Sequence, residues 1–130
     1  MKGKSKLSGA DSLKVLIVDD EEIVRHILKE FLLLMGHQVE EAKDGLTGYQ
    51  LLESNSYDAV FADMRMPGID GSEFLARCKV SHPALPIFII SGHGTDDMRH
   101  EVLSAGAQAF LSKPFSFKEV CELVTALSCS

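Results

Sequence analysis

The run Val15-Leu16-Ile17-Val18, followed directly by Asp19-Asp20-Glu21-Glu22, decides the fold of this chain. A continuous apolar run rich in β-branched residues predicts a strand that is covered on both faces, as strands of parallel sheets are. The strand ends in consecutive carboxylates. Negative charge concentrated at a sheet edge is unfavourable unless a cation or a reaction offsets it. The stretch therefore predicts a buried parallel strand with a charged site at its end.

The composition favours one soluble domain. A chain of 130 residues with 45% hydrophobic residues fits a single core. The net charge of −6 argues against direct nucleic-acid binding and favours cations and basic surfaces as partners. Cys78, Cys121 and Cys129 are odd in number and lack C-x-x-C spacing, which favours a reducing, cytoplasmic compartment over disulfides or a zinc site. Apolar stretches such as 31–35 and 87–90 are too short to span a membrane.

Apolar runs alternate along the chain with segments of helical period, which is typical of βα units on a parallel sheet. We expect strands at 14–18, 37–41, 58–63, 86–90 and 109–112. Helices are expected from Ile23 to a stop at Gly36, around 46–52, after a capping box at Asp70, over 96–104, and after a capping box at Ser116. Residues 1–12 show no period and are expected to form a flexible tail, which leaves 13–128 as the folded domain. The residues expected on apolar helix faces are Ile23, Ile27, Phe31, Leu34, Met98, Val102, Ala105, Phe117, Val120, Val124 and Leu127.

Ligands of parallel α/β sheets bind outside the carboxyl ends of the strands. The residues expected there are Asp19, Asp20, Asp63, Ser91 and Lys113. Each of them alone would be an ordinary cap, turn or solvated residue. Together, these oxygen ligands without nearby His or Cys suit Mg²⁺. The Asp63 carboxylate can act as a nucleophile that forms an aspartyl phosphate, with Mg²⁺, the Lys113 ammonium and the Ser91 hydroxyl as stabilisers.

The same residues carry a resemblance to the receiver domains of two-component response regulators, over about 13–127. Its motifs are Val-Asp-Asp-Glu at 18–21, Asp-Met-Arg-Met-Pro-Gly at 63–68, Ile-Ser-Gly-His at 90–93 and Lys-Pro-Phe at 113–115. The resemblance implies a flavodoxin-like α/β fold: a five-stranded parallel sheet of order 2-1-3-4-5 with five helices on two faces. The first and last helices would share one face.

The resemblance also implies a role for each matching residue. Asp63 would accept a phosphoryl group from the phospho-histidine of a sensor histidine kinase or a phosphotransfer protein. Mg²⁺ would be bound by Asp19, Asp20, Asp63 and the backbone carbonyl of Arg65. The remaining implied roles are phosphoryl contacts for Ser91 and Lys113, a switch formed by Ser91 and Phe110, tuning of the phosphoryl lifetime by Arg65 and His93, and a cis peptide bond at Lys113-Pro114.

The leading hypothesis is a cytoplasmic signalling switch rather than an enzyme. Phosphorylation would change the surface formed by 96–104, 109–112 and the last helix, which an output domain or protein would contact and through which a homodimer could form. Glu21 and Glu22 would be first-turn residues matched to a helix dipole. Two alternatives are a Mg²⁺-dependent phosphatase that passes through an aspartyl phosphate and an interaction module that is inert to phosphorylation. The sequence leaves open a stand-alone regulator or the receiver of a longer one.

Overall fold

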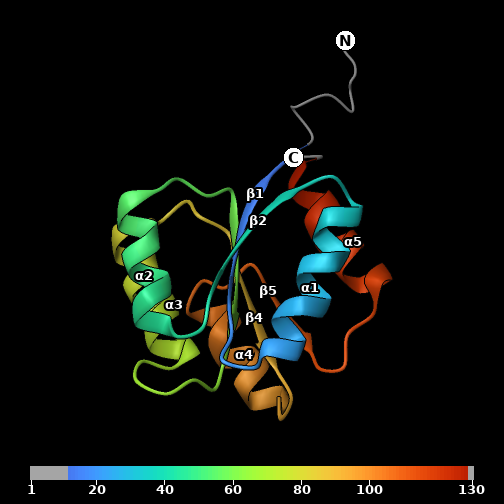
Figure 1. Cartoon of the computed structure of the whole chain (residues 1–130). Coiled ribbons are helices and arrows are strands. Elements are labelled where there is room, and N and C mark those ends of the chain that lie inside the picture. The colour runs from blue at the N-terminus through green and yellow to red at the C-terminus, as the bar shows by residue number, and fades with distance from the viewer. Residues whose placement is uncertain (1–11, 129–130) are drawn as a thin grey trace.

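The computed structural model describes residues 12–128, and its strands and helices alternate along the chain (Figure 1). The predicted tail lies outside the described residues, apart from Ser12. The strands are β1 (Lys14–Val18), β2 (Gln38–Ala42), β3 (Ala59–Asp63), β4 (Ile87–Ser91) and β5 (Ala109–Ser112). The helices are α1 (Glu22–Leu34), α2 (Gly45–Ser54), α3 (Gly71–Ser81), α4 (Asp96–Ser104) and α5 (Phe117–Ser128).

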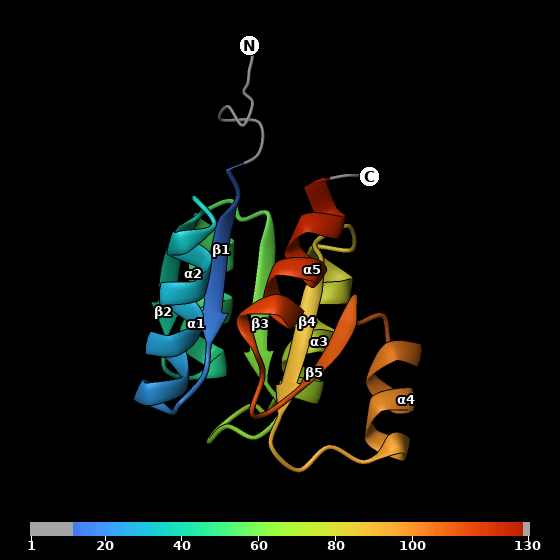
Figure 2. The ribbon, with the colours of Figure 1, turned by 90° about the vertical axis from the view of Figure 1, so that its right-hand side faces the viewer.

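The strands form one parallel sheet of order β2-β1-β3-β4-β5, which confirms the predicted flavodoxin-like topology. Strand β3 lies in the centre, and all its residues are buried. The carboxyl ends of the strands gather at the lower edge of the sheet in Figure 2, opposite the start of β1. This register places Asp63 beside Ile90, and Ser91 beside Ser112.

Two hydrophobic clusters cover the two faces of the sheet, because alternate residues of each strand point to opposite sides. One cluster joins Val15, Ile17 and Phe61 to residues of α1 and α5. The other joins Leu16, Val18 and residues of β3–β5 to α2, α3 and α4. Figure 1 shows α2 and α3 on one side of the sheet and α1 and α5 on the other. This division of the helices is the one that the resemblance implied.

Helix α1 forms where the apolar spacing predicts it, but a different face is buried. Leu28 and Leu32 are the buried residues of α1. Ile23 is 74% exposed and Leu34 is 76% exposed. Of the expected residues, Phe31 is partly buried and packs against the core, as predicted, but the fully buried residues lie on the neighbouring face of the helix. Periodicity alone cannot tell which of two adjacent apolar faces packs inward.

Smaller corrections concern other helices and strand ends. Ala105 is the exposed C-cap residue of α4, whereas Val102 is buried as predicted. Phe117 is 40% exposed at the start of α5, and only Val120 and Val124 of its expected face are fully buried. Strands β2, β3 and β4 each begin one residue later than predicted. Of the described residues, none belongs to a helix long and apolar enough to cross a membrane.

The predicted helix ends are confirmed by their hydrogen bonds. Gly36 has a φ of 90°, and the amides of Gly36 and His37 donate to the carbonyls of Leu33 and Leu32 at the end of α1. The Asp70 carboxylate accepts from the amide of Glu73 at 2.9 Å. These local signals end α1 and begin α3, and the second of them fixes the end of the loop that follows Asp63.

Candidate functional site

The sheet topology brings residues that are far apart in the sequence to one edge. Asp19 follows β1, Asp63 ends β3, Ser91 ends β4 and Lys113 follows β5. Asp19, Asp63 and Ser91 are buried. The amide of Lys113 donates to the carbonyl of Ser91 at 2.9 Å, which fixes the start of the loop after β5 against the end of β4. The strands therefore deliver the predicted side chains to one region.

The three predicted carboxylates form a cluster. Asp19, Asp20 and Asp63 each offer an oxygen within 4.8 Å of the others. Asp19 Oδ1 accepts a hydrogen bond from the amide of Glu21 at 2.8 Å. Asp19 Oδ2 is buried, has no hydrogen-bond partner among the described residues and lies 3.4 Å from the Lys113 ammonium. A buried carboxylate oxygen without a hydrogen bond, beside two further carboxylates, fits a hard cation such as Mg²⁺, which prefers oxygen ligands.

Lys113 provides the positive charge of the cluster. Its Nζ lies 3.4 Å from Asp19 Oδ2 and 3.4 Å from Asp63 Oδ1. The same ammonium lies 2.6 Å from Glu21 Oε1, and this is the shortest of its three ion pairs. Lys113 therefore links Asp19, Asp63 and Glu21. The Lys113-Pro114 peptide bond is cis.

Burial and charge shift the ionisation of this cluster. Burial, together with the neighbouring charge of Asp19, raises the pKa of Asp63 from 3.8 to about 6, although Lys113 and a backbone hydrogen bond from Arg65 oppose the rise. Burial also raises the pKa of Asp19, against the hydrogen bond from Glu21 and the charge of Lys113. For Lys113, burial alone would lower the pKa, but the hydrogen bond to Glu21 and the surrounding carboxylates raise it overall. Above a pH of about 6 the buried Asp63 carboxylate is therefore ionised, although little solvent reaches it.

Ser91 and Phe110 lie on β4 and β5 near this edge. The Ser91 hydroxyl accepts a hydrogen bond from the amide of His93 at 3.2 Å. Phe110 is buried, and its ring packs so closely on Gly94 that a Cβ there would lie 2.4 Å from the ring. The guanidinium of Arg99 lies 5.9 Å from the centre of the Phe110 ring. Gly94 therefore makes room for an aromatic ring, because a residue with a Cβ would collide with it.

Arg65 and His93 are exposed residues of the loops after β3 and β4. Arg65 contacts the cluster through the backbone hydrogen bond to Asp63 described above. Their proposed effect on the phosphoryl lifetime stays a prediction.

Sequence reasoning missed two residues of the site. Glu21 was assigned to the first turn of α1, but it is the N-cap residue, makes no side-chain capping bond and contacts Lys113 instead. Gly71 begins α3 against the backbone of Asp63, where a Cβ would lie 2.5 Å from the Asp63 carbonyl oxygen. The capping signal of Asp70 marks this helix start in the sequence, but no sequence pattern shows which backbone it packs on.

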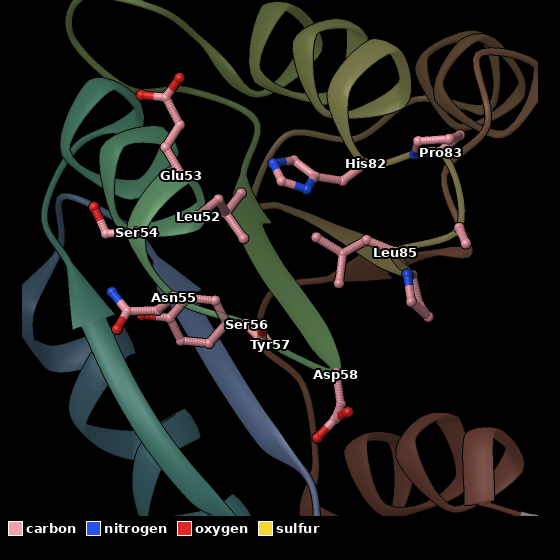
Figure 3. A pocket seen from close by; sticks show the side chains of 12 residues that line it. Leu52, Glu53, Ser54, Asn55, Ser56, Tyr57, Asp58, His82, Pro83 and Leu85 are labelled. Atoms are coloured by element: carbon pink, nitrogen blue, oxygen red, sulfur yellow. The ribbon is translucent and has the colours of Figure 1, made fainter.

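An open cavity of about 690 Å³ lies at the opposite edge of the sheet (Figure 3). Its lining includes Asp58 before β3 and His82, Leu85 and Pro86 before β4. The cavity and Asp63 lie at opposite ends of β3, and a strand of this length spans roughly 15 Å. The charged cluster and this cavity are therefore separate features.

Comparison with known proteins gives concordant matches. Residues 15–125 match the family model described as response regulator receiver domain. The transcriptional regulatory protein QseB of Haemophilus influenzae is 34% identical over 115 residues, or 88% of this chain and 52% of QseB. SrrA of Staphylococcus aureus is 34% identical over 116 residues, or 89% of this chain and 48% of SrrA. The chain thus spans about half the length of these curated relatives.

The fold also matches solved structures of receiver domains. The receiver domain of the Francisella response regulator 1452 has a TM-score of 0.85 with this chain at 29% sequence identity. That match covers 91% of this chain and 98% of the solved one. The agreement therefore extends over nearly the whole domain.

Proposed function

We propose that this chain, which belongs to the response regulator receiver family, is a phosphorylation-operated switch with Asp63 as its acceptor. One observation carries the proposal: the buried Asp63 carboxylate lies in a cluster with Asp19 and Asp20 and 3.4 Å from the Lys113 ammonium. The folded unit would be 13–128, in the cytoplasm. The match to the receiver family supports a role in two-component signalling.

In the proposed reaction, a carboxylate oxygen of Asp63 attacks the phosphorus of a phospho-histidine on a sensor histidine kinase or phosphotransfer protein. The new O–P bond forms as the P–N bond breaks, and the electron pair returns to the histidine nitrogen. Asp19, Asp20, Asp63 and the carbonyl of Arg65 would hold Mg²⁺. When bound, this cation would neutralise part of the charge that collects on the phosphoryl oxygens.

The chain's own residues would stabilise the product. Lys113 already lies beside Asp63 and would contact a phosphoryl oxygen of the aspartyl phosphate. The Ser91 hydroxyl, at the end of the adjacent strand, would donate a second hydrogen bond. Hydrolysis by water would return the free carboxylate and inorganic phosphate. The chain would thus assist its own phosphorylation and dephosphorylation without acting on a separate substrate.

Phosphorylation would be read at the surface of α4, β5 and α5. A Ser91 hydroxyl drawn toward the phosphoryl group would loosen the packing of Phe110 against Gly94 and Arg99. The Phe110 ring and α4 would then have two arrangements, one without and one with the phosphoryl group. Phosphorylation would shift the equilibrium toward the second. The proposed readers are an output domain or protein, or a second copy of the chain that forms a homodimer.

Mass spectrometry of the intact chain tests this function. Incubation with Mg²⁺ and acetyl phosphate should add one phosphate, and both D63N and omission of Mg²⁺ should abolish the addition. An unmodified wild-type chain would favour a module that is inert to phosphorylation. Turnover of a phosphomonoester that survives D63N would favour a phosphatase. Either result would refute the proposal.

A further inference from the structure

The ammonium of Lys113 contacts a carboxylate outside the cation cluster more closely than it contacts the acceptor. Its Nζ is 2.6 Å from Glu21 Oε1 and 3.4 Å from Asp63 Oδ1. Glu21 does not belong to the group of carboxylates whose oxygens lie within 4.8 Å of one another. The closest ion-pair partner of Lys113 in this structure is therefore neither the acceptor nor a residue of the cluster.

The backbone explains why Glu21 is available to Lys113. Glu21 has the extended conformation of an N-cap residue, with φ −91° and ψ 111°, and its side chain makes no capping bond. Its amide donates to Asp19 Oδ1 at 2.8 Å, which ties the start of α1 to the buried carboxylate. The side chain is 59% exposed, yet it points to Lys113, which lies 92 residues further along the chain. Glu22, the next residue, is exposed and lies in the first turn of α1.

We propose that Glu21 is a positioning residue, which keeps the Lys113 ammonium drawn toward its own carboxylate and away from closer contact with Asp19 and Asp63 until a phosphoryl group arrives. This inference rests on the proposed function of Asp63. A cation held by Asp19, Asp20 and Asp63 repels the Lys113 ammonium. Glu21 offers that ammonium a carboxylate outside the cluster, and so favours cation binding before phosphorylation. A phosphoryl group on Asp63 then draws Lys113 away from Glu21, and the ion pair is lost or weakened.

Loss of this ion pair should have opposite effects on two ligands. Without the Glu21 carboxylate, Lys113 returns to Asp19 and Asp63, competes with the cation and weakens Mg²⁺ binding. In a variant without the Glu21 carboxylate, Lys113 can contact a phosphoryl group without first breaking its ion pair with Glu21. A phosphoryl mimic should therefore bind this variant more tightly. An exposed ion pair is worth enough to change each dissociation constant by roughly two- to five-fold.

The test is an NMR titration of the full chain with Mg²⁺, and then with beryllofluoride at saturating Mg²⁺, which mimics the phosphoryl group. The variants are E21Q, which removes the charge, and E21D, which keeps the charge but shortens its reach by one methylene. E22Q is the matched control, since it removes a neighbouring exposed charge. The ¹H–¹⁵N signal of the Lys113 side chain in metal-free protein reports the ion pair directly.

We expect both Glu21 variants to shift the Lys113 signal, weaken Mg²⁺ binding and tighten beryllofluoride binding, while E22Q changes each constant by less than two-fold. An E21D variant that matches the wild type while E21Q differs would show a general charge effect and would overturn the positioning role. Unchanged constants in both variants would overturn it as well. If wild type binds beryllofluoride and D63N does not, these failures leave the proposed function intact. A wild type that binds no beryllofluoride refutes both.

Discussion

The buried carboxylate of Asp63 should weaken the fold in the absence of a cation, and D63N should relieve this cost. Asparagine has nearly the shape of aspartate but cannot ionise. The raised pKa of Asp63 means that the folded state binds a proton more tightly than the unfolded state does. The ionised form therefore opposes folding, and replacement by a neutral side chain should stabilise the protein.

The magnitude follows from the pKa. A tenfold change in an equilibrium constant corresponds to about 1.4 kcal/mol, so a rise from 3.8 to about 6 costs the ionised form about 3 kcal/mol. The cost is fully present above the folded-state pKa of about 6. This cost decreases as the pH falls from about 6 toward 3.8, because Asp63 then binds a proton in the folded state and loses its charge. At pH 4.5 about 1 kcal/mol should remain.

Urea unfolding followed by circular dichroism measures this difference, since the chain has no tryptophan. Wild type and D63N are compared at pH 8 and pH 4.5, with EDTA to exclude divalent cations. The control is E122Q, which neutralises an exposed carboxylate on α5. We expect D63N to be more stable than wild type by about 3 kcal/mol at pH 8 and by about 1 kcal/mol at pH 4.5.

Two results would refute this reasoning. A D63N variant less stable than wild type at pH 8 would mean that the ion pair with Lys113 outweighs the burial of the carboxylate. A gain of equal size at both pH values would mean that ionisation of Asp63 is not its cause. Mg²⁺ at pH 8 should stabilise the wild type more than D63N, because a bound ligand stabilises only the state that binds it.

Three further changes probe the packing around the site. G94A would place a methyl group 2.4 Å from the Phe110 ring and should cost about 1–3 kcal/mol in urea unfolding, whereas the same substitution in an F110A background should cost much less, because the clashing ring is absent. F61A removes a fully buried ring from the centre of the sheet and should lower the free energy of unfolding by about 3–5 kcal/mol; a loss below 1 kcal/mol would contradict its core position. S116A breaks the capping box at the start of α5. In this box the Ser116 hydroxyl accepts a hydrogen bond from the amide of Glu119, and the Glu119 carboxylate accepts one from the amide of Ser116. The substitution should lower the free energy of unfolding by about 1 kcal/mol without changing the Mg²⁺ affinity.

Much of the fold could be predicted from the sequence because its signals are local. The continuous apolar runs at β1 and β4 indicate strands covered on both faces, and the structure buries them so. Gly36, Asp70 and Ser116 mark helix ends through hydrogen bonds that span only a few residues. The alternation of strands and helices then leaves a parallel sheet as the simplest arrangement.

The candidate site could be predicted in part for a related reason. Parallel strands all end at one edge of the sheet, so the residues that follow them are brought together whatever the details of packing. Asp19, Asp20, Asp63 and Lys113 do form one cluster in the structure. Their chemical types already indicated a cation and a phosphoryl group.

The tertiary structure alone decided which faces and side chains meet. The sequence by itself determined a helix at α1, but the docking of that helix buries Leu28 and leaves Ile23 exposed. It determined an acidic run after β1, but only the position of Lys113 showed that Glu21 belongs with the ammonium rather than with the helix dipole. The contact between Glu21 and Lys113 joins residues 92 positions apart. No local pattern encodes such a contact, because its geometry depends on how every element between the two residues packs.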